Sequence, residues 1–379
     1  MRVTHTLIHS MAGVFGNTRS ENYLDTWLGR TARALRHADP SLEVECVFPE
    51  WGVRRPETFE DRGITYRLFP SRLFSRGREY SRALIGHARK AAAEGALLHL
   101  HGYHNTHGYR LAAIDAPKVA QHHGDPPPLM YGPRAPLDFL GGLKERWDRS
   151  AMRRLDQVYY LTDEEHAYLL GLVPEAHMRR QTMGVDFERF RPRPAAAARA
   201  KLGLPAEGPL LLFVGNVRPS KGVDLAIRAL TSLDKDVRLA VVGHAPPEVR
   251  AELQGLAQAQ GLQERVHWLG RVDEDALVEA YAAADLLVLP SAWEGAPVCI
   301  MEALACDVPV VATSVGAVPS MVGPYGVLAA RRDAAALADA LREALGRDFP
   351  PSRADAARRY SWPAIAAATL ADYRRLARA

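Results

Sequence analysis

The sequence has little cysteine and no long hydrophobic run. Its three cysteines, Cys46, Cys299 and Cys306, are odd in number and lack zinc-site spacing, which argues against a disulfide framework and for a reducing compartment. No apolar run is long enough to span a bilayer, and histidines interrupt any signal-peptide core near the start. We therefore expect a cytoplasmic protein.

The chain also has little net charge, since 48 basic residues stand against 44 acidic ones. This balance excludes an argument for nucleic-acid binding from charge alone. One basic concentration stands out, because residues 72–90 carry six basic side chains against the single Glu79. A basic amphipathic helix there could contact an anionic membrane or a phosphorylated acceptor, but a solvated helix face is the interpretation we favour.

Two common nucleotide-binding motifs are missing. The sequence contains no Walker loop, and no expected strand leads into G-x-G-x-x-G. These absences argue against a P-loop NTPase and against a nicotinamide-dependent dehydrogenase.

The second half of the chain alternates apolar, β-branched runs with helical patterns. Such alternation predicts a parallel sheet covered on both faces, with ligands bound beyond the carboxyl ends of its strands. Polar, glycine-rich segments follow the expected strands, so these loops should gather at one edge of the sheet. The expected strands are 209–215, 237–243, 265–270, 285–291, 308–313 and 325–330.

The first half follows a looser version of the same scheme, and a proline-rich segment interrupts the alternation. At 379 residues, the chain is long enough for two domains, each with its own core. We predict two Rossmann-like α/β domains that face one another across a cleft. Their expected bounds are 1–188, a linker at 189–208, 209–360, and a final helix at 361–379 that packs back on the first domain.

The segment SAWEGAPVCIMEALAC (291–306) combines an apolar helix with two carboxylates, Glu294 and Glu302. A buried glutamate needs a partner, and a core arginine is one alternative. A bound ligand is the other. Lys221, at the end of GNVRPSKG, and Arg218 before it suit a polyanion, and the N–H groups of the helix beginning at Pro297 would add a second anion site. Glu302 could then accept ribose hydroxyls.

These segments together resemble a known family. FVGNVRPSKG, WLGRVDEDALVEAYAAADLLVLPS, EGAPVCIME and MGVDFERFRP look like the family 4 retaining glycosyltransferases of the GT-B architecture. The spacing of Glu294 and Glu302 is similar to the E-x7-E signature of that family. The resemblance extends over residues 180–350 and implies transfer of a hexose-type sugar from a nucleotide-diphospho-sugar to an acceptor hydroxyl.

The resemblance implies a role for each matching residue. Lys221 would bind the diphosphate, Glu302 the ribose and Glu294 the hydroxyls of the transferred sugar. His123, at the end of KVAQHHG, would lie beside that sugar. Further donor contacts would come from Gly13 and Gly16 in a first glycine-rich loop, and from Asn216 and Arg218 in the loop after the first strand of the second domain. Arg271 and Val272 would flank the base, and Ala296, Pro297 and Val298 would contribute at the start of the helix.

No metal or other cofactor is implied for this mechanism, which would proceed by front-face transfer with retention. The D-x-D strings at 234–236 and 273–275 are interpreted as turn and cap residues. HLHGYHNTH (99–107) could suggest a metal site, but a role in shaping the acceptor pocket is the interpretation we favour.

Two alternatives to a transferase remain. A nucleotide-sugar 2-epimerase shares the architecture, and a non-catalytic nucleotide-sugar-binding protein would fit the departures from the family pattern at Asn216 and Ser320. The sequence leaves the donor base and the acceptor open, whether the acceptor is a saccharide, lipid-linked or a small molecule.

Overall fold

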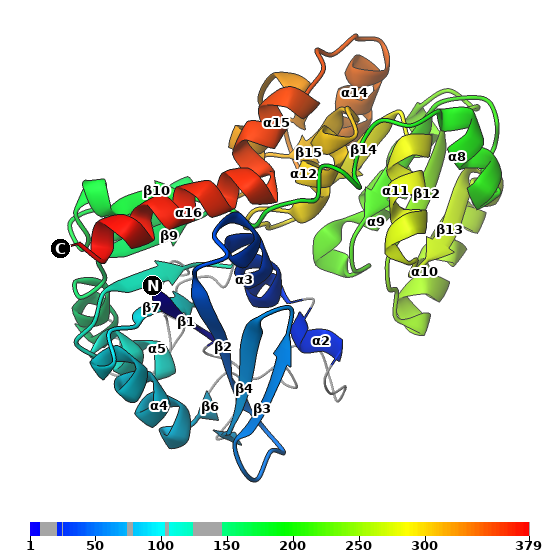
Figure 1. Cartoon of the computed structure of the whole chain (residues 1–379). Coiled ribbons are helices and arrows are strands. Elements are labelled where there is room, and N and C mark those ends of the chain that lie inside the picture. Colours follow the sequence, from blue (N-terminus) through cyan, green and yellow to red (C-terminus); the bar gives the residue numbers. More distant parts are fainter. Residues whose placement is uncertain (8–20, 25, 74–78, 103–105, 124–145, 379) are drawn as a thin grey trace. The chain divides into compact units, whose positions relative to one another are not determined.

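The computed structural model divides into two compact units, described here separately (Figure 1). Unit 1 comprises Met1–Gly184 and Trp362–Ala379, and unit 2 comprises Val185–Ser361. The structure describes residues 1–7, 21–24, 26–73, 79–102, 106–123 and 146–378.

Unit 1 contains an eight-stranded sheet in the order β10-β9-β8-β7-β1-β2-β4-β3, in which only β3 runs antiparallel to its neighbour. The central strands β1, β7 and β8 are buried along almost their whole length, as strands covered on both faces should be. The strands are β1 (Arg2–Leu7), β2 (Glu43–Glu50), β3 (Glu57–Asp61), β4 (Ile64–Pro70), β7 (Leu97–His101), β8 (Lys118–Gln121), β9 (Gln157–Tyr160) and β10 (Met178–Arg180).

Helices α3 and α4 of unit 1 begin at polar N-cap residues. Thr26 caps α3 by accepting from the N–H of Gly29, and Ser81 caps α4 by accepting from that of Leu84. Helix α16 packs against α3. The helices are α2 (Glu21–Leu24), α3 (Trp27–Ala38), α4 (Arg82–Ala93), α5 (Thr106–Ala112), α7 (Asp163–Leu169) and α16 (Trp362–Leu376), with a 3₁₀ turn η1 (Glu175–His177); residues 146–152 are also helical.

The basic segment 72–90 does not form one helix. It begins with β5 (Arg72–Leu73) and β6 (Glu79–Tyr80), which pair with each other, and α4 starts only at Arg82. On α4, apolar side chains are buried while Arg89 and Lys90 are exposed, as on an ordinary solvated helix. Membrane contact by this segment stays a prediction.

Unit 2 contains a six-stranded, wholly parallel sheet in the order β13-β12-β11-β14-β15-β16. Numbered from the first strand of the unit, this order is 3-2-1-4-5-6, the Rossmann arrangement, whose order reverses between β11 and β14. All six predicted strands of this half are confirmed: β11 (Leu210–Val214), β12 (Arg238–Val242), β13 (Val266–Gly270), β14 (Leu286–Leu289), β15 (Val310–Thr313) and β16 (Gly326–Ala329).

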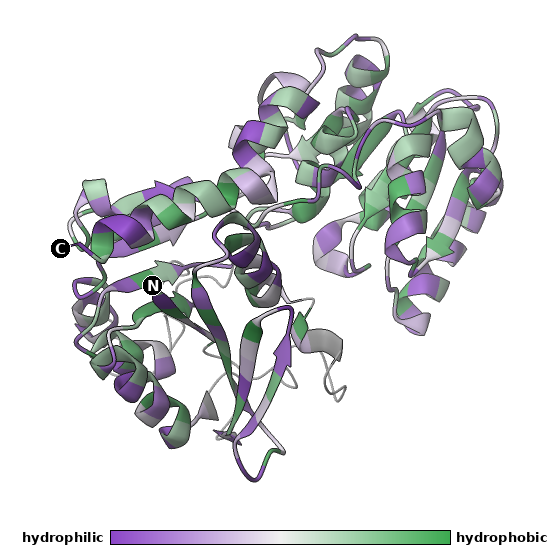
Figure 2. Cartoon of the chain, viewed as in Figure 1, coloured by the Kyte–Doolittle hydropathy of each residue, from purple (hydrophilic) through white to green (hydrophobic). Residues whose placement is uncertain are grey.

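Apolar side chains of the strands and of most helices share one core in unit 2 (Figure 2), while α8 packs on α11 and α15 packs on α12. The helices are α8 (Ala195–Leu202), α9 (Val223–Ala229), α10 (Pro247–Ala259), α11 (Glu274–Ala283), α12 (Val298–Ala305), α13 (Val318–Val322), α14 (Ala334–Leu345) and α15 (Arg353–Tyr360), with short 3₁₀ turns η2 (Pro219–Lys221), η3 (Leu230–Ser232), η4 (Gln263–Arg265) and η5 (Gly323–Tyr325).

Residues 189–208, which the sequence indicated as a linker, are part of unit 2. They contain α8, which packs on α11. Buried Arg199 fixes α8 there, because it donates to the carbonyl oxygen of Ala283 over 3.0 Å and to a carboxylate oxygen of Asp285 over 2.8 Å. A helix joined to the core in this way is not a free connection between domains.

None of the helices in the described part of the chain is long and apolar enough to cross a membrane.

Candidate active site

Two loops meet at the point where the strand order of unit 2 reverses. Residues 215–222 follow β11 and residues 290–297 follow β14, and these strands are neighbours. A crevice beyond the strand ends forms at such a reversal in parallel α/β sheets. The first loop carries Lys221 and the second carries Glu294, so the topology brings together two residues that lie 73 positions apart.

Lys221 and Glu294 form an ion pair. The Lys221 Nζ lies 2.6 Å from the Glu294 Oε1, which also accepts a 2.6 Å hydrogen bond from the hydroxyl of buried Ser291. The Glu294 side chain is only 8% exposed, but Lys221 is 27% exposed. The partner of Glu294 is therefore a lysine at the strand ends that solvent and ligands can reach.

The two loops are held together by further hydrogen bonds. The backbone N–H of Ala292 donates to the carbonyl oxygen of Ser220 over 2.7 Å. Arg332 donates from Nε to the carbonyl oxygen of Pro290 and from Nη2 to that of Pro219. These bonds fix the separation of the loops and therefore the positions of Lys221 and Glu294.

The loop after β15 supports the backbone of Glu294. The N–H of Ala317 donates to the carbonyl oxygen of Gly295 over 2.9 Å. At Gly316 the backbone has a φ of +52°, and a Cβ there would lie 1.8 Å from the Glu294 carbonyl oxygen. Only glycine fits this contact, because a side chain would displace the strand-end loop.

Glu302 lies on α12, the helix that follows the Glu294 loop. Its Oε2 accepts a 2.7 Å hydrogen bond from the hydroxyl of Tyr281 on α11. Burial, with the Glu302 charge as a second cause, raises the pKa of Tyr281 well above its ordinary value, so the tyrosine stays a donor at neutral pH. Glu302 is half-buried, and its carboxylate accepts a hydrogen bond from the neutral Tyr281 hydroxyl.

Cys299 lies on α12, and Cys306 is the C-cap residue of that helix. Burial is the main cause that raises the thiol pKa of Cys299, and it raises that of Cys306 to about 12. Both thiols are therefore protonated at neutral pH and serve as small packing groups.

The start of α12 lies directly after the Glu294 loop. The helix begins at Val298, with Pro297 as its N-cap, one residue later than the sequence suggested. Proline has no side chain that can cap the helix, so the first N–H groups of α12 have no side-chain cap. Ala296 and Val298 are half-buried and Pro297 is buried.

The other predicted donor contacts of unit 2 lie at the same edge of the sheet. Asn216 and Arg218 are exposed in the loop after β11. Exposed Arg271 and half-buried Val272 follow β13, which lies two strands from β11 at the sheet edge. Arg271 and Val272 are therefore farther from Glu294 along this edge of the sheet than Lys221 is.

In unit 1, His123 follows β8 at the carboxyl end of the sheet. Its Nε2 lies 2.8 Å from the Nδ1 of His101 on the neighbouring strand β7. Burial lowers the pKa of His123 to about 3, which makes its ring neutral at physiological pH. Gly13 and Gly16 lie outside the described residues.

The two D-x-D strings lie at a helix cap and in a turn, as the sequence predicted. Asp273 is the N-cap of α11 and accepts from the N–H of Ala276 over 2.8 Å. Asp234 closes a turn through its carbonyl oxygen, which accepts from the N–H of Val237.

Sequence reasoning missed several residues that position the carboxylates. Ser291 stood inside the quoted segment, and Gly316 stood in the glycine-rich loop after an expected strand, so both had a local signal. Tyr281 and Arg332 had none, because a local sequence pattern does not indicate which distant segment a side chain will contact.

Comparison with known proteins gives consistent matches. Residues 195–360 match the family described as Glycosyl transferases group 1. The D-inositol 3-phosphate glycosyltransferase 2 of Catenulispora acidiphila is 36% identical over 239 residues, which are 58% of this chain and 56% of that protein. The chain thus spans little more than half the length of this curated relative.

Solved structures match over nearly the whole chain. A sucrose-phosphate synthase from Thermosynechococcus elongatus has a TM-score of 0.74 at 23% identity, with 99% of each chain covered. HepE of Anabaena, solved in complex with UDP, has a TM-score of 0.74 at 18% identity and covers 99% of this chain and 100% of its own. These likenesses concern the fold of both units.

Proposed function

Since this chain belongs to the GT-B glycosyltransferases of the family 4 type, we propose that it transfers a hexose-type sugar from a nucleotide-diphospho-sugar to an acceptor hydroxyl. The observation that carries this proposal is the pairing of Lys221 with Glu294 at the strand-order reversal of unit 2. A cation and a carboxylate at that edge match the two ends of a sugar diphosphate, one anionic and one rich in hydroxyl groups.

Lys221 binds the diphosphate in this proposal. Its ammonium group is partly exposed and exchanges its Glu294 partner for phosphate oxygens when the donor binds. The N–H groups at the start of α12 add the positive end of a helix dipole. The charge of the departing diphosphate is then stabilised by groups already in place.

Glu302 and Glu294 contact the two sugars of the donor. Glu302 is half-buried and held by Tyr281, so its carboxylate can accept two hydroxyl groups of a ribose. Glu294, freed from Lys221, accepts hydroxyl groups of the transferred hexose and fixes its orientation. A contact of His123 with the transferred sugar, which the family resemblance implies, stays a prediction.

The transfer proceeds at the front face of the sugar with retention of configuration and without a metal ion. The acceptor hydroxyl attacks on the side from which the diphosphate leaves, and its proton passes to the departing phosphate. Orientation and charge stabilisation supply the rate enhancement, so no pair of carboxylates acting as in a glycosidase is needed.

A thermal-shift panel with uridine, guanosine, thymidine and adenosine diphospho-sugars tests this function. Binding to the folded state stabilises by mass action, so one nucleotide at about 100 times its Kd should raise the melting temperature by roughly 5 to 10 °C. The selected donor, incubated without an acceptor, should show at most slow hydrolysis. A C2 epimer would instead identify an epimerase, and no turnover with any acceptor would indicate a binding protein.

Replacing Lys221 with alanine should weaken the binding of the selected nucleoside diphosphate by roughly 10- to 100-fold, because a hydrogen bond to a charged group contributes about 1.5–3 kcal/mol. Calorimetry measures this change. Lys235→Ala is the matched control, since exposed Lys235 precedes β12 at the opposite edge of the same sheet. Equal affinity in the parent and Lys221→Ala would remove Lys221 from the phosphate site.

A further inference from the structure

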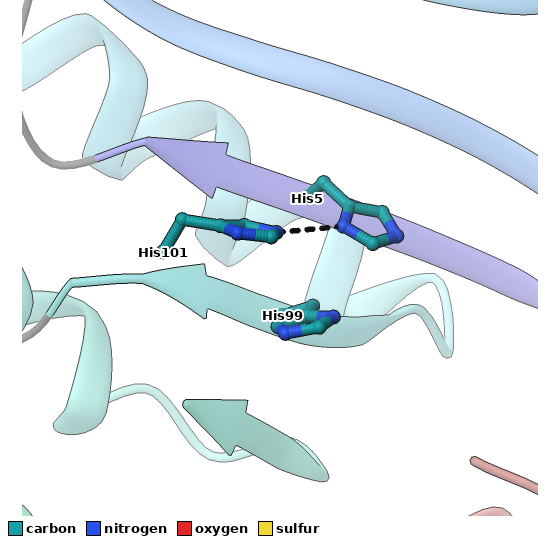
Figure 3. A group of neighbouring side chains, drawn as sticks. All are labelled: His5, His99 and His101. Atoms are coloured by element: carbon teal, nitrogen blue, oxygen red, sulfur yellow. Dashed lines mark hydrogen bonds between the residues drawn. The ribbon is translucent and has the colours of Figure 1, made fainter. Parts of the chain in front are cut away.

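Three buried histidines from neighbouring strands share one face of the unit 1 sheet (Figure 3). His5 lies on β1 directly opposite His99 on β7, and His101 follows two positions later on the same face. Their rings are close, with centroids 4.3 Å apart for His99 and His101 and 4.7 Å apart for His5 and His99. Sequence reasoning considered His99, His101, His104 and His107 as a possible metal site, and it missed His5 because the strand register that adds it was not visible.

Each of these rings has a hydrogen-bond partner on its outer side. The His101 Nδ1 lies 2.8 Å from the His123 Nε2, and the His99 Nδ1 lies 2.5 Å from the hydroxyl of Tyr373 on α16. The His5 Nε2 lies 3.4 Å from the same hydroxyl. Three outer ring nitrogens are thus held by two groups, His123 and Tyr373.

The remaining ring nitrogens are the His5 Nδ1, the His99 Nε2 and the His101 Nε2. Those of His5 and His101 lie 2.9 Å apart, and the dashed line in Figure 3 marks their contact. The His99 Nε2 is buried and has no hydrogen-bond partner among the described residues. One ring nitrogen from each histidine lies within 4.8 Å of those of the other two.

All three rings are buried, and imidazole binds metals in its neutral form.

We propose that His5, His99 and His101 bind one divalent transition-metal ion of the zinc type. Imidazole nitrogens favour zinc and its neighbours over magnesium or calcium, which prefer oxygen ligands. Two nitrogens bound tetrahedrally at about 2.0–2.1 Å lie roughly 3.3 Å apart. The nitrogens of His5 and His101, 2.9 Å apart, therefore need to separate by about 0.4 Å, and a ligand nitrogen 4.8 Å away would need to approach by about 1.5 Å.

The outer hydrogen bonds fit this assignment. Histidines that bind metals almost always donate their second ring N–H to a fixed acceptor, which orients the ring. Here the Tyr373 hydroxyl can accept from His5 and His99, and the His123 Nε2 can accept from His101. The site lies within unit 1 and shares His123 with the proposed sugar contact, but the test of zinc binding needs no sugar transfer.

Zinc titration of the full chain, stripped with a chelator, tests the site. Calorimetry should show one equivalent of Zn²⁺ bound with a Kd below about 1 µM, accompanied by a higher melting temperature. Co²⁺ in its place should give the visible absorption of a tetrahedral ion. The proposal is overturned if the parent chain binds no more zinc than His99→Gln.

Two further variants keep the test decisive if His99→Gln folds poorly. Tyr373→Phe removes the acceptor of two ligand rings but keeps the rings themselves, and it should weaken zinc binding by about 10- to 100-fold. His267→Gln is the control, because the Nε2 of this half-buried histidine of unit 2 also lacks a partner among the described residues. Unchanged affinity in Tyr373→Phe, or loss of binding in His267→Gln, would contradict the assigned ligands.

Discussion

Replacing Glu294 with glutamine should lower the turnover number of sugar transfer by about 100-fold or more while leaving the affinity for nucleoside diphosphate unchanged or slightly higher. Glutamine has nearly the same shape, so the buried position beside Ser291 stays filled. The variant loses the negative charge that orients the transferred sugar. It also frees Lys221 from its carboxylate partner, which favours the diphosphate. Steady-state kinetics and calorimetry measure the two effects separately.

The control for this variant is Glu279→Gln. Glu279 is also a buried carboxylate of unit 2, paired with Lys201 over 2.7 Å and with Arg193 over 2.9 Å. Its loss should affect stability and leave the turnover number within about threefold of the parent. The role of Glu294 fails if its glutamine variant turns over at the parental rate, or if affinity and turnover fall together.

Replacing Gly316 with alanine should lower turnover by about 100-fold although this residue contacts no substrate in the proposal. The new Cβ would lie 1.8 Å from the carbonyl oxygen of Glu294, so the strand-end loop must move by about 1 Å or more. A displacement of that size at a catalytic group costs about 100-fold. The positive φ of +52° adds about 1 kcal/mol of backbone strain.

Gly203→Ala is the control that separates backbone strain from displacement of the Glu294 loop. Gly203 has a φ of +64° in the left-handed region, but no described atom lies within 4 Å of a Cβ built there. This variant should lose about 1 kcal/mol of unfolding free energy and keep its turnover, as measured by denaturant melts and kinetics. Equal turnover losses in both variants would show that strain, and not the position of Glu294, matters.

The sequence predicted the sheet of unit 2 well, because buried parallel strands leave a clear signal. Runs such as LLLFV and LLVL are apolar on both faces, and they alternate with helices of 3.6-residue periodicity. The same reasoning missed β10, which has three half-buried residues, and β3, an antiparallel edge strand with few apolar residues. Short or exposed strands depend on tertiary pairing more than on local pattern.

The candidate site was partly visible in the sequence. Lys221 and Glu294 each follow a strand, and strand ends gather at one edge, so their proximity was predictable. Their direct ion pair was not, since it depends on β11 and β14 being neighbours although two strands separate them along the chain. The same limit applies to His5 and His99, which meet only because β1 pairs with β7.

The boundaries between the units were harder to predict than their cores. The proline-rich segment indicated a linker, yet Arg199 binds α8 to α11 and the strand region. One arginine that bridges two elements far apart in sequence gives no periodic signal.

A crystal structure of the chain with its selected nucleotide-sugar tests the central claim most directly. We expect the Lys221 ammonium group on the diphosphate, the Glu302 carboxylate on the ribose hydroxyl groups, and Glu294 turned from Lys221 to the hexose. A donor bound elsewhere, with the Lys221–Glu294 ion pair intact, would contradict the account.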